Sequence, residues 1–395
     1  MGTRPEAIKL APVIKALERS RRLQPVVIST GQHREMLDQI VETFDLQIEH
    51  DLEVMQQNQD LAGLTARLIV GASSLLQTLS PDFVLVQGDT TSVWCAGLAA
   101  FYHGIPIGHV EAGLRTGDRY APFPEEINRR LVTPLAELHF AATEGARRNL
   151  LAEGIADSNI EVTGNPVIDA LEIECARQAQ PCAERREQHA LAAQLGHDWD
   201  TRPMILVTAH RRESFGPGLA AICQALAELA DRFADHLIVY PLHLNPNVQQ
   251  PVRASLEGHS NIKLIAPQGY SAFVALLRHC RIVLTDSGGL QEEAPALGKP
   301  VLVMREKTER QEGIAAGTAA LVGTETERIV AMASHLLCDE AAYQRMARAV
   351  NPYGDGKAAE RIVAGVDRFL RPGGDDRGVT PTARPTVREG YAAKS

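Results

Sequence analysis

Three carboxylates in the first half of the chain stand where side chains of an open α/β sheet reach a ligand. Asp89 follows the apolar run VLVQG, Glu111 ends the run IPIGHVEAG, and Glu125 opens the helical pattern EEINRR after PFP. One such carboxylate often does no more than cap a helix or complement its dipole. Three acids at one loop edge instead predict proton transfer.

The second half of the chain carries groups suited to an anionic phosphate. The run VTAHRRE presents His210 with two arginines at a strand end, and YPLHLNPN repeats the pattern with His243. The string TDSGGLQEEAP places Ser287, Gly288 and Gly289 between a strand and a helix, where exposed backbone N–H groups readily bind a diphosphate. A glutamate further along that helix can reach a ribose diol.

The opening stretch MGTRPEAIKL indicates a glycine turn that leads into a helix, with Pro5 at an early helical position and two cations, Arg4 and Lys9, near its start. A turn of this kind normally follows a buried strand, and here only Met1 precedes it. We expect that either the true protein begins several residues upstream of Met1 or a central strand of the first sheet is lacking. A protein made from Met1 is then expected to be poorly soluble or weakly active, because neighbouring strand edges stay unpaired.

Apolar runs bounded by turns alternate along the chain with helical patterns such as residues 61–79, 218–233 and 326–337. This alternation predicts parallel sheets with helices on both faces, hence two doubly wound, Rossmann-like α/β domains that face a cleft holding the site. We expect the domains to span residues 1–168 and 169–370, with the last helix packing back on the first domain. Residues 371–395, rich in Gly, Pro, Asp, Arg and Thr, predict a disordered tail.

Composition excludes several function classes. The chain has 395 residues, 45% of them hydrophobic, and a formal net charge of −9, which argues against nucleic acid or an anionic membrane as the main partner. No apolar run of membrane-spanning length and no signal-like leader is present, so a cytoplasmic location is expected. The six cysteines form no CxxC pair, and no nicotinamide, P-loop or zinc signature occurs, so neither cofactor nor metal is expected.

Ten motifs occur in this order along the chain: GTRPEAIKLAPV, GQHREMLDQ, QGDTTS, HVEAGLRTGD, PFPEEINRRL, TGNPVIDAL, VTAHRRESFG, YPLHLNPNV, TDSGGLQEEAPALGKPVLVMRE and NPYGDGKA. Taken together, they closely resemble the non-hydrolysing bacterial UDP-N-acetylglucosamine 2-epimerases. The resemblance covers nearly everything from Gly2 to about Leu370.

The resemblance implies a two-domain fold of the GT-B type and reversible conversion of UDP-GlcNAc to UDP-ManNAc without NAD or metal. Anti elimination of UDP gives 2-acetamidoglucal, and syn addition returns UDP with C2 inverted. By motif, Asp89, Glu111 and Glu125 are the acid/base carboxylates, His210 is the catalytic histidine, and Glu126 supports a helix start. The implied UDP contacts are Arg4, Lys9, Ser287, Gly288, Gly289, Glu293 and Arg310.

The resemblance also predicts partners. Some members of the family bind a second UDP-GlcNAc as activator, and the matching positions here are Gln32, His33, Arg34, Arg211 and His243. Members commonly form homodimers, and the product would supply ManNAc units for cell-surface polysaccharide.

Three other functions remain open from the sequence alone. A retaining glycosyltransferase of the same fold would need an acceptor site, and the carboxylate cluster favours epimerisation over it. A hydrolysing epimerase that releases free ManNAc is often fused to a sugar kinase domain, for which no residues remain. A catalytically silent sugar-nucleotide sensor is expected to lose some carboxylates, and none is lost here.

Overall fold

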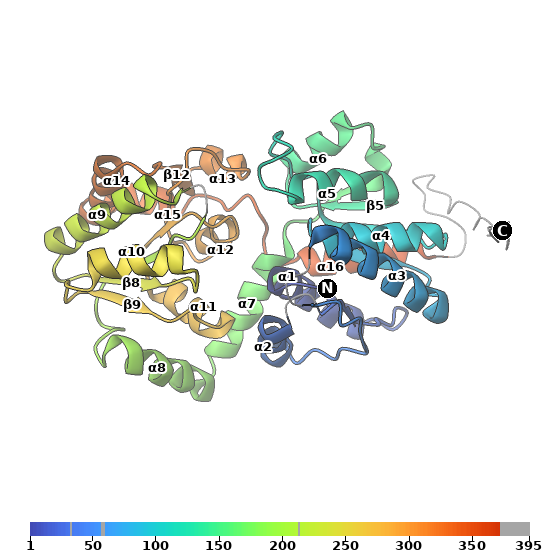
Figure 1. The fold of residues 1–395 in the computed structure, drawn as a ribbon, viewed down its shortest axis with the longest axis horizontal. Coiled ribbons are helices and arrows are strands. Elements are labelled where there is room, and N and C mark those ends of the chain that lie inside the picture. The colour runs from blue at the N-terminus through green and yellow to red at the C-terminus, as the bar shows by residue number, and fades with distance from the viewer. Residues whose placement is uncertain (32–33, 57–59, 212–213, 372–395) are drawn as a thin grey trace. The chain divides into compact units, whose positions relative to one another are not determined.

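The computed structural model describes residues 1–31, 34–56, 60–211 and 214–371 (Figure 1). The chain divides into two compact units: one contains Met1–Asp169 together with the residues from Gly356 onward, and the other contains Ala170–Asp355. Both units are built from parallel sheets and helices, so the predicted α/β class is confirmed. Over the described ranges, no helix is long and apolar enough to cross a membrane.

The second unit holds a six-stranded sheet in the order β12-β11-β10-β7-β8-β9, and every adjacent pair is parallel. Its first strand, β7, therefore lies in the centre, between β8 and β10, which is the order of a doubly wound nucleotide-binding fold. The strands are β7 (Met204–Thr208), β8 (Leu237–Pro241), β9 (Ile262–Ile265), β10 (Ile282–Thr285), β11 (Val301–Val303) and β12 (Ala319–Leu321).

Helices cover both faces of this sheet because its strands alternate apolar side chains between the two faces. Ile205 and Val207 pack on one face against residues of α9, α10 and α14, whereas Met204 and Leu206 pack on the other against α8, α11 and α12. The helices are α7 (Pro166–Gln178), α8 (Pro181–Leu195), α9 (Pro217–Arg232), α10 (Pro246–Leu256), α11 (Tyr270–His279), α12 (Leu290–Ala296), α13 (Gln311–Ala316), α14 (Thr326–Cys338) and α15 (Glu340–Ala347).

The first unit holds a parallel sheet of β3 (Val84–Gln87), β4 (Ile107–Ala112), β5 (Leu138–Ala141) and β6 (Ile160–Val162), in that order. A separate parallel pair is formed by β1 (Ile28–Ser29) and β2 (His50–Asp51). Among the described residues, no ladder of hydrogen bonds joins β1 to β3. The helices are α1 (Arg4–Glu18), α2 (Arg34–Phe44), α3 (Leu61–Leu79), α4 (Thr91–Tyr102), α5 (Glu125–Val132), α6 (Glu144–Ala152) and α16 (Ala358–Phe369), and two 3₁₀ turns span Thr133–Leu135 and Asp157–Asn159.

The four-stranded sheet of the first unit is also covered on both faces. Helices α1 and α16 pack with β4 and β5 on one face, and α3 and α4 pack with β3 and β4 on the other. The last helix, α16, is held to this unit by Asp169, whose carboxylate accepts the backbone N–H groups of Ala358 and Ala359.

The helices expected at 61–79, 218–233 and 326–337 are confirmed as α3, α9 and α14, with ends that agree to within one residue. Helix α3 begins after Asp60, whose side chain accepts the backbone N–H of Gly63. This cap supplies a partner for one of the N–H groups in the first turn, which have none within the helix. Residues 372–395, for which the sequence predicts a disordered tail, lie outside the described residues.

Candidate functional site

In the second unit, the predicted phosphate-binding residues follow β7 and β10, the two strands where the strand order reverses. Ligands of doubly wound sheets bind outside the carboxyl ends of the strands at this point. The two strand ends are joined by a hydrogen bond of 2.6 Å between the hydroxyls of Thr208 and Thr285. The fold therefore brings His210, after β7, next to the Asp286–Ser287 turn, after β10.

Asp286 organises the backbone after β7. Its carboxylate is fully buried, and Oδ2 accepts the backbone N–H groups of His210 at 2.6 Å and Arg211 at 2.7 Å. Hydrogen bonds to a carboxylate are roughly twice as strong as neutral ones. The position of the His210 backbone is thus set by a residue that lies 76 positions later in the chain.

The His210 imidazole is 41% exposed and lies stacked on His243, with ring centroids 5.3 Å apart and an interplanar angle of 9°. Its Nδ1 is 3.6 Å from Oδ1 of Asp286. Partial burial lowers the pKa of His210 below its ordinary value, although the Asp286 charge opposes this shift. His210 is therefore neutral near pH 7, and it can donate a hydrogen bond to a ligand without carrying a charge.

The Ser287–Gly289 turn connects β10 to α12, and the Ser287 N–H donates to the Thr285 hydroxyl at 2.9 Å. A side chain at Gly288 would place its Cβ 2.6 Å from Nη1 of Arg310. Glycine is needed here because the buried guanidinium lies directly against the turn.

Arg310 is held in place by acidic neighbours. Its Nε donates to Glu292 at 2.6 Å, its Nη1 donates to Glu309, and its carbonyl accepts the Tyr353 hydroxyl at 3.1 Å. Burial opposes ionisation of Glu309, but Arg310 and Arg305 together lower its pKa to about 2. Glu293, the predicted ribose contact, lies half-buried on α12, with Oε2 3.6 Å from where a Cβ on Gly289 would stand.

In the first unit, Glu111 lies at the end of β4 with a left-handed backbone, φ +64°, at a register shift between Val110 and Ala112. This conformation is uncommon for a residue with a Cβ, and it turns the carboxylate away from the regular ladder. Lys9 Nζ lies 2.6 Å from both oxygens, Gln87 Nε2 donates at 2.6 Å and Asn165 Nδ2 at 2.9 Å. These donors hold the buried carboxylate in one orientation.

Lys9 thus lies against a predicted catalytic carboxylate. The family resemblance implies that Lys9 contacts UDP, and the structure shows an ion pair between Lys9 and Glu111.

Asp89 follows β3 after Gly88, whose φ of +85° makes the turn. Arg129 of α5 donates to Asp89 Oδ2 through Nε at 2.9 Å, with Nη2 also 2.6 Å away, and Asn128 donates to the Asp89 carbonyl at 2.9 Å. The Asp89 side chain is nevertheless 26% exposed, so it remains accessible to a ligand.

His109 also holds the Gly88 turn in place. Its Nε2 lies 2.8 Å from the Gly88 carbonyl, and burial lowers its pKa to about 4. The neutral ring therefore donates its N–H to that carbonyl.

Glu125 and Glu126 are adjacent in the chain but have different surroundings. Glu126 is 0% exposed and accepts the backbone N–H groups of Thr116 and Gly117 as well as Nη1 of Arg129 at 3.0 Å. It therefore ties the preceding loop to α5. Glu125 is half-buried, and among the described residues its side chain has no hydrogen bond of the kind that binds Asp89 and Glu111.

The start of α1 is held by Glu6, which accepts the Gly2 N–H at 2.6 Å and the Thr90 hydroxyl at 2.6 Å. This glutamate links the opening turn to the loop that carries Asp89. Arg4 begins α1 and is half-buried.

The predicted activator residues are only partly described. Gln32, His33 and the side chain of Arg34 lie outside the described residues, whereas Arg211 and His243 both adjoin His210. In the part of the chain that the structure describes, no group of His, Cys, Asp and Glu could hold a metal ion.

Several residues that hold the site escaped the sequence-based prediction. They are the partners of the predicted residues: Gln87, His109, Arg129, Asn165 and Asp286. All five lie inside the quoted motifs, so their neighbours could have drawn attention to them. Nothing in spacing alone indicates that Asn165 reaches Glu111, 54 positions earlier.

Comparison with known proteins places this arrangement in a family. The family model for UDP-N-acetylglucosamine 2-epimerase matches residues 15–367. The chain belongs to the UDP-N-acetylglucosamine 2-epimerase family. The curated UDP-N-acetylglucosamine 2-epimerase of Escherichia coli (strain K12) is 53% identical over 362 residues, which cover 92% of this chain and 96% of that protein. The Yersinia pestis protein of the same name is 52% identical over 363 residues, with coverage of 92% and 96%.

Solved structures of the epimerase family share the fold. UDP-GlcNAc 2-epimerase from Neisseria meningitidis, bound to UDP-GlcNAc, has a TM-score of 0.87 and 46% sequence identity and covers 92% of this chain and 97% of its own. The enzyme from Methanocaldococcus jannaschii, in complex with UDP-GlcNAc and UDP, has a TM-score of 0.78 and 32% identity, with coverage of 93% and 98%. The resemblance noted from the ten motifs is thereby confirmed.

Proposed function

We propose that this protein interconverts UDP-N-acetylglucosamine and UDP-N-acetylmannosamine by inverting C2 without net hydrolysis. The observation that carries the proposal is the full acid/base set, Asp89, Glu111, Glu125 and His210, on a chain 46% identical to an epimerase solved with UDP-GlcNAc. The three alternative functions fit less well, because a glycosyltransferase needs an acceptor site, a hydrolysing epimerase is often fused to a kinase domain, and a sensor is expected to lose carboxylates.

The proposed reaction begins with loss of UDP. The C2 proton of the sugar is not acidic by itself, so the anomeric C–O bond must break as that proton leaves, and the electron pair departs with the diphosphate. A protein speeds this step by stabilising the charge that develops on the leaving group. We assign that task to His210, the Ser287–Gly289 backbone and Arg310, with Glu293 on the ribose and Arg4 and Lys9 as further UDP contacts.

Proton transfer at C2 is assigned to the three carboxylates. Anti elimination removes the C2 proton from UDP-GlcNAc and leaves 2-acetamidoglucal. Syn addition then returns a proton to C2 from the opposite face, so more than one acid/base group is needed. Overall, one proton leaves and one returns, and the C1–O bond breaks and re-forms, so no oxidant or reductant is consumed. Of the three, Asp89 and Glu111 are each paired with a cation, Arg129 and Lys9.

The pairing of Lys9 with Glu111 is compatible with both assigned roles. A lysine that bonds a carboxylate through Nζ keeps a third donor for a phosphate oxygen. We therefore propose that Lys9 couples the position of Glu111 to the presence of the UDP group.

The activator, the oligomeric state and the cellular role are proposed from the family resemblance. A second UDP-GlcNAc is proposed to act as an activator through Gln32, His33, Arg34, Arg211 and His243. The protein is proposed to work as a cytoplasmic homodimer that supplies ManNAc units for cell-surface polysaccharide. Free thiols at Cys95, Cys223 and Cys280 suit a reducing compartment. This activator proposal is rejected if initial rates measured with UDP-ManNAc alone are linear and traces of UDP-GlcNAc leave them unchanged.

One assay tests the reaction. UDP-GlcNAc is incubated with the protein in D₂O without an acceptor, and the sugar is followed by NMR. UDP-ManNAc with deuterium at C2 is the expected product. Free ManNAc would identify a hydrolysing enzyme, and no exchange at C2 would reject epimerisation in favour of a glycosyltransferase or a binding protein.

A further inference from the structure

The motif NPYGDGKA carries none of the residues assigned so far to the candidate site. Its tyrosine, Tyr353, is nevertheless only 2% exposed, and its hydroxyl lies at the start of α13, beside the predicted UDP contact Arg310. The hydroxyl donates to the Arg310 carbonyl at 3.1 Å and accepts the Gly313 N–H at 3.0 Å. Both functions of this hydroxyl therefore serve the backbone around Arg310.

Tyr353 is itself fixed within the second unit. Its N–H donates to the side-chain oxygen of Asn351 at 3.2 Å, and Asn351 Nδ2 donates to the Glu292 carbonyl of α12 at 3.1 Å. Burial raises the pKa of Tyr353 above its ordinary value, so the hydroxyl keeps its proton and can donate. Loss of the hydroxyl would leave the Arg310 carbonyl buried without this partner.

A second hydroxyl holds the other backbone group of Arg310. The Arg310 N–H donates to Thr308 Oγ1 at 3.1 Å, and this hydroxyl donates in turn to Gln291 Oε1 at 2.7 Å. Gln291 Nε2 then donates to the Ser287 carbonyl at 3.1 Å. Thr308 and Gln291 are both buried. A continuous line of three hydrogen bonds thus runs from the Arg310 backbone to the predicted diphosphate turn.

The segment that carries Arg310 has no regular secondary structure of its own. Residues 305–310 connect β11 to α13, and connecting segments are the more mobile parts of a fold. Yet the Arg310 guanidinium lies close against the turn after β10, since a Cβ on Gly288 would stand 2.6 Å from Nη1. Glutamates bond the guanidinium, whereas the backbone behind it is held by Thr308 and Tyr353.

We propose that Thr308 and Tyr353 are positioning residues of the diphosphate site: their hydroxyls hold the N–H and the carbonyl of Arg310 and thereby keep its guanidinium against the Ser287–Gly289 turn. The inference rests on the assignment of Arg310 to UDP in the proposed function. Neither hydroxyl is assigned a contact with the substrate. Gln291 carries the same restraint on to the turn, so the turn and the arginine form one preorganised group of donors for the leaving diphosphate.

The test measures the affinity for UDP by calorimetry, at a temperature well below the thermal midpoint of each variant. Tyr353→Phe and Thr308→Val each remove one hydroxyl and keep the shape of the side chain. We expect each to weaken UDP binding by roughly fivefold or more, because the guanidinium is no longer held against the turn. Thr308→Ser restores the hydroxyl, and we expect it to bind UDP within about twofold of the parent chain.

Thr326→Val is the matched control for a loss of stability alone. Thr326 is buried much like Thr308, at 9% against 6% exposed, and its hydroxyl donates to the Ala221 carbonyl at 3.0 Å. It begins α14 of the same unit, where no UDP contact is predicted. We expect Thr326→Val to lower the midpoint about as much as Thr308→Val does, while its UDP affinity stays within about twofold of the parent chain.

A double-variant comparison separates positioning from a general weakening of the unit. In an Arg310→Met background the positioned group is absent, so Tyr353→Phe should change the UDP affinity by less than about twofold. A general weakening would act in both backgrounds alike. If Arg310→Met does not fold, since Glu292 and Glu309 lose their cation, Arg310→Lys takes its place in the comparison.

Different results overturn different parts of this reasoning. Parent-like UDP binding by Tyr353→Phe and Thr308→Val, with weak binding by Arg310→Met, would refute the positioning role and leave the UDP contact in place. Equally weak binding by Thr308→Ser and Thr308→Val would show that the hydroxyl is not the group that matters. Parent-like binding by Arg310→Met would remove Arg310 from the UDP site and the inference with it. Failure of C2 exchange in the D₂O assay concerns the reaction alone, because UDP affinity is measured without turnover.

Discussion

Removal of the Arg129 guanidinium should destabilise the first unit by an amount that depends on Glu126. Arg129 lies between two carboxylates, 2.6 Å from Asp89 and 3.0 Å from Glu126, and the Glu126 side chain is 0% exposed. Breaking a buried ion pair by removing one partner costs about 3–5 kcal/mol because a buried charge is left uncompensated. In Arg129→Met, Glu126 keeps the N–H groups of Thr116 and Gly117, so we expect the lower end, about 3 kcal/mol.

The companion variant Glu126→Gln removes the buried charge and leaves Arg129 paired with Asp89. We expect it to cost roughly 1–2 kcal/mol, since one charge-assisted hydrogen bond is lost. In the double variant neither the buried carboxylate nor its cation remains. Its cost should fall below the sum of the single variants by at least about 1 kcal/mol, the coupling expected for residues in contact.

The two tryptophans allow each unit to be followed separately. Trp94 lies in α4 of the first unit, and Trp199 lies in the second. In a Trp199→Phe background, urea unfolding followed by fluorescence reports the first unit through Trp94. Arg147→Met is the matched control, because Arg147 pairs with an exposed Asp157 and its loss should leave the midpoint unchanged. Additivity of the two single variants to within about 0.5 kcal/mol would refute the reasoning.

Three further outcomes are expected. Asp89→Asn should lower turnover by about 10²–10⁴-fold while UDP binding by calorimetry persists, and unchanged turnover would contradict its acid/base role. Gly288→Ala should weaken UDP binding by roughly tenfold or more, about 1.4 kcal/mol, because the new Cβ meets Arg310. Gly258→Ala, with open space around it, is the control, and equal binding by both variants would argue against the assignment. Burial lowers the pKa of His109 to about 4 and of His139 to about 3. The unfolded state therefore binds more protons below the ordinary pKa of about 6.5, and each histidine should remove up to roughly 1.4 kcal/mol of stability per pH unit as the pH falls from about 6 toward 4. In urea unfolding followed through Trp94, His139→Phe should flatten this dependence, and an unchanged slope would show that the histidine is not its source.

Local sequence patterns were sufficient to predict apolar strands and helices of this protein. Apolar runs of strand length and helices such as α3 follow from side-chain periodicity, and Gly88, at the carboxyl end of β3, supplies the positive φ that its turn needs. The positions of Asp89, Glu111 and His210 at strand ends follow from the same patterns. These features depend on neighbours in sequence, so one chain was enough to predict them.

The partners of the site residues could not be predicted in this way. Asp286 holds the backbone of His210, Asn165 and Lys9 hold Glu111, and Arg129 holds Asp89, and these pairs are separated by between 40 and 102 positions. No periodicity links residues so far apart. Asp286 and Asn165 meet their partners because parallel strands deliver their carboxyl ends to one edge of a sheet. Lys9 and Arg129 reach theirs from helices α1 and α5.

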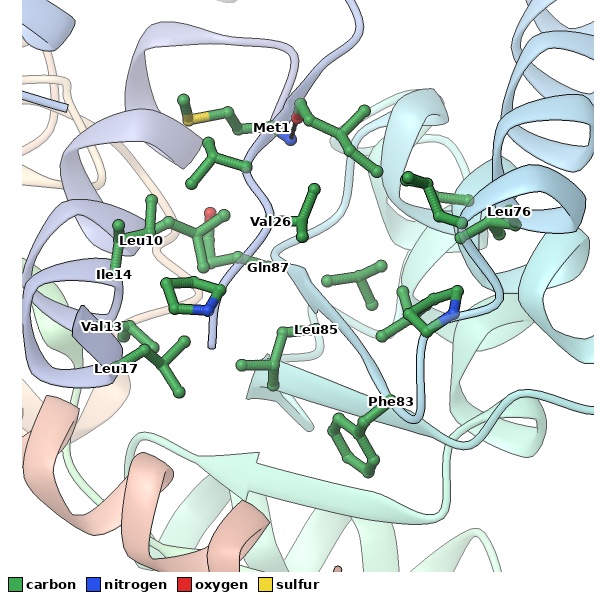
Figure 2. Close-up of a pocket in the computed structure, with 18 of the residues that line it drawn as sticks. Met1, Leu10, Val13, Ile14, Leu17, Val26, Leu76, Phe83, Leu85 and Gln87 are labelled. Carbon is green, nitrogen blue, oxygen red and sulfur yellow. Dashed lines mark hydrogen bonds between the residues drawn. The ribbon is translucent and has the colours of Figure 1, made fainter. Parts of the chain in front are cut away.

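The opening stretch MGTRPEAIKL shows the division most clearly. The sequence by itself determined that a glycine turn leads into a helix, since φ/ψ preferences and helix starts are local properties. Only the tertiary structure decided that Met1 forms a single parallel rung with β1, and that an apolar groove lies between β1 and β3 (Figure 2). The physical reason is that a strand's partners and the space beside it depend on elements from across the unit, whereas its propensity depends on its own residues.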